Sequence, residues 1–200
     1  MRILFVIDGL PGGGAEKVVL TLAEAFLRQG DKVSLFSLRK VCEYPLPDGL
    51  DYQVIDDDCR KPWRKLTELS RRAAQLDAAI VNAEQSGRFE LVVSSLHKTD
   101  RIVSRSRALR DHNLWFCLHG MFSTSYLGHR KGLDRWLKQQ KIKRVYQGRN
   151  LVTVSDAVGR DLVEQFAIQP AQLLTIYNPF DIAALRARAE EPCEMAGEDY

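Results

Sequence analysis

The chain has 200 residues, of which 45% are hydrophobic, enough to bury the core of one domain or, less often, of two small ones. The formal net charge of +3 is too small to indicate a nucleic-acid partner. No apolar run is long enough to span a bilayer, and the run after Arg2 is too short for a signal peptide, so we expect a cytoplasmic protein.

The first 30 residues predict a strand, a glycine-rich turn and a helix. A short apolar run from Ile3 to Ile7, closed by Asp8 and a Gly/Pro cluster, indicates the strand. Apolar residues spaced by three and four then predict a helix that ends at Gly30. The turn between them contains Gly9, Gly12, Gly13 and Gly14.

A turn of this kind can bind an anion or a sugar, because the first turn of a helix has unpaired N–H groups that glycines leave accessible. The alternative is that the glycines only make the turn tight. A Walker loop is excluded, since Ala15 and Glu16 stand where Lys and Ser or Thr are required. The dinucleotide fingerprint is also incomplete, although Arg39 at the end of the second strand leaves an NADP site as an alternative.

Further along, short apolar runs alternate with stretches of helical periodicity. We expect six more strands, at 32–38, 52–55, 90–96, 114–118, 151–154 and 173–177. We expect helices at 63–86, 98–109 and 133–147, a helix that Ser155 or Asp156 caps, and a polar helix to about 191. Loops are expected at 41–51 and 121–132.

This alternation predicts an α/β fold with a doubly wound, mainly parallel, Rossmann-like sheet and helices on both faces. Residues 1–190 form one domain in this interpretation, and residues 191–200 form a linker or a disordered tail. The absence of a C-x-x-C pair predicts free thiols in a reducing compartment for Cys42, Cys59, Cys117 and Cys193.

Two charged groups in the middle of the chain have simple interpretations. The acidic run from Asp56 to Asp58 predicts a solvated turn and not a metal site, because no His or Glu is placed to complete a ligand set. The basic residues early in the helix at 63–86 are expected to form a solvated face; they are Arg64, Lys65, Arg71 and Arg72.

His119 and Gly120 directly follow the predicted fifth strand. Because the carboxyl ends of parallel strands meet at one edge of a sheet, His119 can share a crevice with Gly12, Gly13 and Gly14. A purely structural role is the alternative for a lone histidine at a strand end.

The helix at 133–147 and the residues before it are strongly basic, with apolar residues between the charges. Such a helix can lie on an anionic membrane or bind acceptor phosphates, and the alternative is a solvated helix whose apolar side lies in the core. The candidate patch consists of Arg130, Lys131, Arg135, Lys138 and Lys141.

Four segments occur in an order and spacing that point to a known family. Gly13-Gly14-Ala15-Glu16 opens the first helix, His119-Gly120 ends the fifth strand, and the stretches 152–155 and 174–181 follow. Together they resemble the N-terminal domain of family-4 retaining glycosyltransferases of the GT-B fold, over residues 1–190. Pro179 and Phe180 depart modestly from the Asn-Gly-Val-Asp that the family more often has there.

The resemblance implies that His119 orients the transferred sugar and stabilises developing charge, and that Glu16 fixes the turn without acting as a base. The candidate substrate-binding residues are Gly12, Gly13, Gly14, Glu16, Gly120, Ser155 and Asn178. No cofactor or metal is expected, since the nucleotide sugar is a substrate.

The resemblance also implies that the C-terminal domain that holds the nucleotide sugar is absent from these 200 residues, so that they cannot transfer sugar alone. The expected partners are that domain, a glycan or lipid-linked acceptor and, at the inner face, an anionic membrane surface. The rival functions are an NADP-binding oxidoreductase domain and a standalone sugar- or phosphate-binding module.

Overall fold

The computed structural model describes residues 1–59, 64–180, 182, 186 and 189–190. The strands are β1 (Arg2–Ile7), β2 (Lys32–Ser37), β3 (Asp51–Val54), β4 (Leu91–Ser95), β5 (Leu114–Leu118), β6 (Asn150–Thr153) and β7 (Gln172–Thr175). The helices are α1 (Gly14–Arg28), α2 (Arg64–Ala83), α3 (His97–Val103), α4 (Gly132–Tyr146) and α5 (Asp156–Phe166), with single turns η1 (Glu84–Ser86) and η2 (Ser123–Leu127). The predicted helix to about 191 lies largely outside the described residues, and the predicted tail lies entirely outside them.

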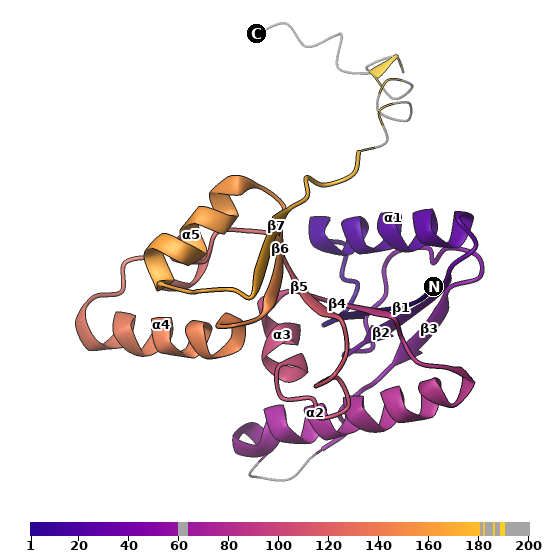
Figure 1. The fold of residues 1–200 in the computed structure, drawn as a ribbon, viewed down its shortest axis with the longest axis horizontal. Helices are drawn as coiled ribbons and strands as arrows, with labels where there is room; N and C mark the ends of the chain where they lie inside the picture. Colours follow the sequence, from indigo (N-terminus) through magenta and orange to yellow (C-terminus); the bar gives the residue numbers. More distant parts are fainter. Residues whose placement is uncertain (60–63, 181, 183–185, 187–188, 191–200) are drawn as a thin grey trace, which may run out of the picture.

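The strands form one parallel sheet in the order β3-β2-β1-β4-β5-β6-β7. The chain starts in the middle of the sheet at β1, builds outward through β2 and β3, and then returns to β4 on the other side of β1 (Figure 1). The predicted doubly wound, parallel α/β sheet is therefore confirmed. In such sheets the crevice at the carboxyl ends of the strands, where the winding direction reverses, is the usual ligand site.

Two apolar cores lie on the two faces of this sheet. Side chains of β1 alternate between them, as they must on a strand: Ile3, Phe5 and Ile7 pack under α1, and Leu4 and Val6 pack on the opposite side. Among the described helices, α1 alone covers the first face, whereas α2 to α5 contribute to the second core (Figure 1). Helices thus lie on both faces, but unequally.

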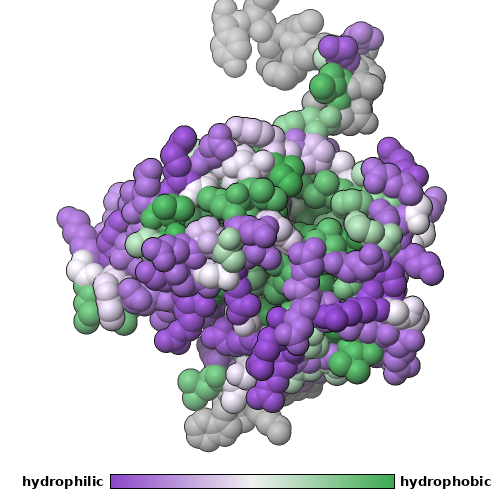
Figure 2. All heavy atoms as spheres, viewed as in Figure 1, coloured by the Kyte–Doolittle hydropathy of each residue, from purple (hydrophilic) through white to green (hydrophobic). Residues whose placement is uncertain are grey.

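Part of the face that α1 covers remains open beyond that helix. An apolar groove of about 360 Å³ runs along it, with Leu22 of α1 on one side and Leu174 and Ile176 on the other. Ile176 is 56% exposed. Figure 2 shows hydrophobic atoms around a hollow between the positions of α1 and α5. Contiguous exposed apolar surface of this kind commonly marks a contact with another segment or domain.

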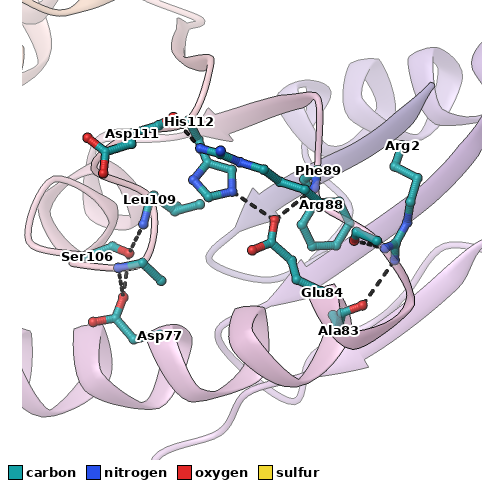
Figure 3. A network of polar contacts seen from close by, with 12 residues as sticks. Arg2, Asp77, Ala83, Glu84, Arg88, Phe89, Ser106, Leu109, Asp111 and His112 are labelled. Carbon is teal, nitrogen blue, oxygen red and sulfur yellow. Dashed lines mark hydrogen bonds and ion pairs between the residues drawn. The ribbon is translucent and has the colours of Figure 1, made fainter.

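A polar network at the edge opposite the carboxyl ends joins α2 to the connections around β4 and β5 (Figure 3). Glu84 accepts hydrogen bonds from the backbone N–H of Phe89 and pairs with Nε2 of His112, each at 2.8 Å. Burial alone would raise the pKa of Glu84, but the bonds from His112 and Phe89 outweigh it and lower that pKa. The network fixes how α2 meets the sheet.

The helix predicted at 98–109 is shorter in the structure, where α3 ends at Val103. The cause is Asp77 of α2, whose carboxylate accepts hydrogen bonds from Ser106 and from the backbone N–H groups of Arg107 and Ala108. These amides would otherwise continue a helical ladder, so the tertiary contact overrides the local preference. The sequence around 98–109 contains no sign of this distant acceptor.

Two smaller predictions were also wrong. The stretch 121–132, predicted as a loop, contains the helical turn η2, because Asp161 accepts hydrogen bonds from the backbone N–H groups of Phe122 and Ser123. Arg71 and Arg72 do not belong to a solvated face: Arg71 pairs with Asp57, and Arg72 is only 5% exposed. The acidic turn is accordingly held by Arg71 at its middle residue. Cys117 is buried and, like the other described cysteines, free.

Candidate functional site

His119 lies directly after β5, at the carboxyl edge of the sheet. Its two ring nitrogens are buried and have no hydrogen-bond partner among the described residues. Burial lowers the pKa of His119, so the imidazole is neutral at pH 7. It lines a cavity of about 230 Å³ together with Leu96, Gly120, Ser125 and Tyr126. An unpartnered, neutral imidazole beside a cavity can hydrogen-bond a ligand without first breaking an internal bond.

A chain of buried polar groups supports the wall of this cavity. Asp100 is fully buried and forms hydrogen bonds with the Ser94 hydroxyl at 2.5 Å and with the Tyr146 hydroxyl at 2.7 Å. The same hydroxyl lies 2.9 Å from Nδ1 of His97. Because Nδ1 is occupied by Tyr146, only Nε2 of His97 is free to meet a ligand. This series of hydrogen bonds therefore connects the core of the sheet to a second histidine, His97, at the cavity wall.

Desolvation dominates the protonation of these groups. Burial raises the pKa of Asp100 to about 8, although the bonds from Ser94 and Tyr146 oppose the shift, so Asp100 is protonated at neutral pH. Burial, followed by the charges of Arg101 and Lys138, lowers the pKa of His97 to about 4. Both histidines of the site are thus neutral at pH 7.

A second cavity of about 350 Å³ adjoins the first and shares His97 and Tyr126 with it. Its remaining lining is basic apart from Ile142: Lys98 and Arg101 from α3, and Lys138 and Lys141 from α4. A larger cavity of about 720 Å³ lies at the opposite edge of the sheet, beside the first residue of β5. We place the candidate site at the carboxyl edge, because the two histidine-lined cavities lie where parallel sheets bind ligands.

The glycine turn lies at the same edge, after β1. Gly12 has φ +87°, a backbone conformation that side chains rarely adopt. At Gly13 a Cβ would overlap the Glu16 carboxylate, which is folded back against the start of α1, and the Tyr44 hydroxyl donates to the Gly13 carbonyl at 3.0 Å. A Cβ on Gly14 would meet nothing within 4 Å, so this residue faces open space.

Glu16 changes what the turn can bind. Residue Glu16 is only 7% exposed. Its carboxylate lies at the positive end of the α1 dipole, which is the position that a phosphate would take. A second anion there would meet like charge. The exposed amides around Gly14 are therefore better suited to neutral sugar hydroxyls than to a phosphate.

Asp8 connects the turn to the basic cavity. It is buried at the end of β1 and forms ion pairs with Arg39 at 2.6 Å and with Lys98 at 3.3 Å. Arg39 follows β2 and Lys98 lies at the start of α3, so this carboxylate joins three strand ends. None of the cavities described above is lined by both the glycine turn and His119.

The remaining predicted residues lie at other positions. Ser155 is the N-cap of α5 and accepts a hydrogen bond from the backbone N–H of Val158 at 3.4 Å. Of the two caps predicted, Ser155 and Asp156, the structure therefore has Ser155. Asn178 lines the apolar groove and its buried Oδ1 has no partner among the described residues. A Cβ on Gly120 would meet nothing within 4 Å.

The predicted basic patch divides into two parts. Lys138 and Lys141 line the basic cavity. Arg130 pairs with Asp134 at 2.5 Å near the start of α4, where Lys131 is the exposed N-cap residue and Arg135 is half-buried. The apolar residues between the charges also divide. Ile142, Val145 and Tyr146 are buried in the core, whereas three near the start of the helix are exposed: Leu133 (70%), Trp136 (53%) and Leu137 (44%).

Sequence reasoning missed four residues of this site, namely His97, Lys98, Arg101 and Tyr126. One signal was present: His97 follows β4 almost as closely as His119 follows β5. No group of three His, Cys, Asp or Glu residues in the described part of the chain could hold a metal ion. None of the described helices is both long and apolar enough to cross a membrane.

Comparison with known proteins decides the family. The family described as Glycosyltransferase Family 4 matches residues 12–184. The chain belongs to this family. A search of curated proteins found no significant match. The family assignment confirms the resemblance seen in Gly13-Gly14-Ala15-Glu16 and His119-Gly120.

Solved structures with a similar fold are about twice as long as this family-4 chain. Sucrose-phosphate synthase from Thermosynechococcus elongatus superposes with a TM-score of 0.63 at 14% identity, over 96% of this chain and 53% of that one. Anabaena Alr3699/HepE, solved with UDP and glucose, superposes with a TM-score of 0.60 at 16% identity, over 95% of this chain and 50% of that chain. WaaG, a glycosyltransferase involved in lipopolysaccharide biosynthesis, superposes with a TM-score of 0.56 at 13% identity, over 94% of this chain and 50% of that chain. The chain spans about half the length of these structures, and its fold is that of one half of a GT-B glycosyltransferase.

Proposed function

We propose that this chain is the acceptor-binding half of a retaining glycosyltransferase. The enzyme moves a hexose or related sugar from a nucleotide-sugar donor to a glycan or lipid-linked acceptor, as in polysaccharide or lipopolysaccharide synthesis. The observation that carries the proposal is His119, a neutral and unpartnered imidazole beside a cavity at the carboxyl edge of the sheet. Membership of family 4 supplies the reaction class.

Each part of the site has a role in such a transfer. Retention breaks the bond from the anomeric carbon to the nucleotide diphosphate and forms a bond to an acceptor oxygen on the same face. His119 hydrogen-bonds the transferred sugar and holds it as charge develops on its ring. The amides around Gly14 contact sugar hydroxyls, while Glu16 keeps the turn in shape.

A second domain supplies the donor site in this proposal. Two observations support it: the chain spans about half of each similar structure, and an apolar groove remains open beside α1. Tyr177, 66% exposed, and Asn178 lie at that groove, just after β7. We assign the groove to contact with the C-terminal domain, so these 200 residues alone do not transfer sugar.

We place the enzyme at the cytoplasmic face of a membrane. Leu133, Trp136 and Leu137 are exposed near the start of α4, and the basic residues Lys131 and Arg135 accompany them. Figure 1 shows this end of α4 at the periphery of the molecule. Apolar side chains can enter the interface while the cations meet anionic lipid. The free thiols of the described cysteines agree with a reducing compartment.

A standalone sugar- or phosphate-binding module is the second candidate, because both histidine-lined cavities form within this chain alone. An NADP-binding oxidoreductase domain has less support. Arg39, which would have to meet the 2′-phosphate, is engaged by Asp8, and the family is that of a transferase.

Turnover of nucleotide sugars tests the proposal. The 200-residue chain and the same chain joined to the polypeptide encoded downstream are assayed with a panel of nucleotide sugars and lipid-linked acceptors. We expect product from the joined chain only, with the anomeric configuration of the donor preserved in its NMR spectrum. Product from the 200 residues alone contradicts the division of labour, an inverted product contradicts retention, and no product from either favours the binding module.

A further inference from the structure

The basic cavity beside His97 contains an excess of positive charge. Four cations line it, Lys98, Arg101, Lys138 and Lys141, and no carboxylate does. Burial, followed by the charges of Arg130, Arg101 and Lys141, lowers the pKa of Lys138. Its ammonium also lies 5.4 Å from the centre of the Tyr126 ring, which keeps it directed at the cavity.

Nearby acids do not neutralise this charge. Asp8 contacts Lys98, but the same carboxylate is shared with Arg39 at a shorter distance. Asp134 is paired with Arg130, and Asp100 lies buried behind the cavity in its protonated form. Arg101, Lys138 and Lys141 have no ion pair in the part of the chain that the structure describes. Like charges placed together without acids are stabilised by a bound anion.

Size and position restrict the ligand further. At about 350 Å³ the cavity is in the range of small-molecule sites, larger than an isolated phosphate requires. It shares His97 and Tyr126 with the cavity of His119. A group held by the four cations therefore leaves the attached part of its molecule beside His119, where the sugar is transferred.

We propose that this cavity binds a phosphate or diphosphate group of the acceptor, through Arg101, Lys138 and Lys141, with Lys98 closing its inner side. The inference rests on the proposed function, because it takes the ligand to be the acceptor. Arg101 supplies a planar fork of donors that suits phosphate oxygens, and the lysines supply point charges. His97 offers Nε2 as a further polar contact. The phosphate comes from a soluble sugar phosphate or from the headgroup of a lipid carrier.

Binding of inorganic pyrophosphate to the 200-residue chain tests the site itself. Titration calorimetry at two salt concentrations gives Kd for the parent, Arg101→Ala, Lys138→Ala and Lys141→Ala. Each variant should weaken binding about tenfold, and higher salt should weaken binding by the parent. Lys143→Ala removes the same charge from the same helix outside the cavity lining, and it should bind like the parent. Absence of binding, or equal loss in Lys143→Ala, overturns the proposal.

A second comparison separates the two sources of phosphate. Glucose 1-phosphate serves as the soluble ligand, and vesicles of phosphatidylcholine with or without phosphatidic acid serve as the lipid. A soluble source predicts that Lys138→Ala weakens binding of glucose 1-phosphate, and a lipid source that it weakens binding to phosphatidic acid. Either result supports the phosphate site, and an effect on neither contradicts it. Because these are binding measurements, they can fail while sugar transfer by the joined chain succeeds, so the two proposals are tested separately.

Discussion

Buried Asp100 is the residue whose protonation matters most for the structure of the site. Its carboxyl group is hydrogen-bonded to Ser94 and Tyr146, and Tyr146 in turn holds His97. Desolvation of a charged carboxylate at this depth is costly, so the neutral form is retained at pH 7. The position of one cavity-lining histidine thus depends on a proton in the core.

The contribution of Asp100 to the free energy of unfolding should fall as the pH rises, whereas a carboxylate with a lowered pKa contributes more as the pH rises. Below pH 3.8 Asp100 is protonated in both states; between 3.8 and about 8 the unfolded chain loses the proton and the folded chain keeps it. Asp100 therefore lowers the free energy of unfolding as pH rises through this window, by at most about 1.4 kcal/mol per pH unit. Above about pH 8 the effect is complete.

Urea unfolding of the parent and Asp100→Asn across pH 4 to 9 measures this effect. Carboxylates with a lowered pKa, such as Asp57 beside Arg71, change stability in the other direction, but they are common to both chains. We expect the advantage of Asp100→Asn over the parent to grow with pH. A difference that is independent of pH would show that Asp100 does not titrate as described.

Individual residues differ in how far the sequence predicts them. The position of His119 at the end of an apolar strand is visible in the local sequence pattern, and its role was implied by the family resemblance. Asp100 and Tyr146 are 46 positions apart, and their hydrogen bond depends on how α3 and α4 pack. Lys98 and Arg101 line the basic cavity together with Lys138 and Lys141, and this also depends on how α3 and α4 pack.

At the scale of elements, the start of α1 combines two glycines with different constraints. Gly13→Ala should displace the Glu16 carboxylate and destabilise the fold by about 1 kcal/mol, since that carboxylate is nearly buried. Gly14→Ala meets no atom within 4 Å and should stabilise the helix by up to about 1 kcal/mol.

A double-mutant cycle isolates the contact between Gly13 and Glu16. Thermal and urea unfolding of Gly13→Ala in a Glu16→Ala background should show most of the Gly13→Ala cost removed. If the cost is the same in both backgrounds, the overlap with Glu16 is not its origin.

The exposed part of α4 should determine membrane contact. Leu133→Ser with Trp136→Ser removes two side chains that can enter the lipid interface, so partition onto vesicles rich in anionic lipid should fall about tenfold. Leu66→Ser is the control, because Leu66 is 85% exposed on α2. Vesicle sedimentation provides the measurement. Equal partition of parent and double variant would remove the membrane from the proposed function.

Elements were predicted well where their stabilising contacts are local and poorly where a distant group intervenes. Strands β1, β2, β4 and β5 are largely buried and mainly apolar, and Ser155 caps its own helix, so these features are visible in the sequence. The end of α3 depends on Asp77 and the turn η2 on Asp161, each far along the chain. No local pattern announces such acceptors.

At the scale of the whole molecule, the uneven cover of the sheet is the main feature. Alternation of strands and helices predicted the two-faced sheet, but periodicity does not reveal that four described helices lie on one face and α1 on the other. The groove left beside α1 is apolar, and the proposed C-terminal domain would cover it.

The groove can be followed with a dye that fluoresces on apolar surfaces. The 200-residue chain should bind the dye, and Leu174→Ser with Ile176→Ser should reduce that binding, whereas Val81→Ser on α2 should not. Joining the chain to the proposed C-terminal domain should reduce dye binding to a similar extent. Full dye binding by the joined chain would show that the groove has another purpose.

The most direct test of the central claim is the turnover number of the joined enzyme with His119→Asn. His119 makes no hydrogen bond within the described part of the chain, so the variant should keep the thermal stability of the parent while its kcat falls by about 10²–10³. His129→Asn, an exposed histidine outside both cavity linings, should leave kcat unchanged. A folded His119→Asn enzyme with the kcat of the parent would contradict the placement of the reaction beside this imidazole.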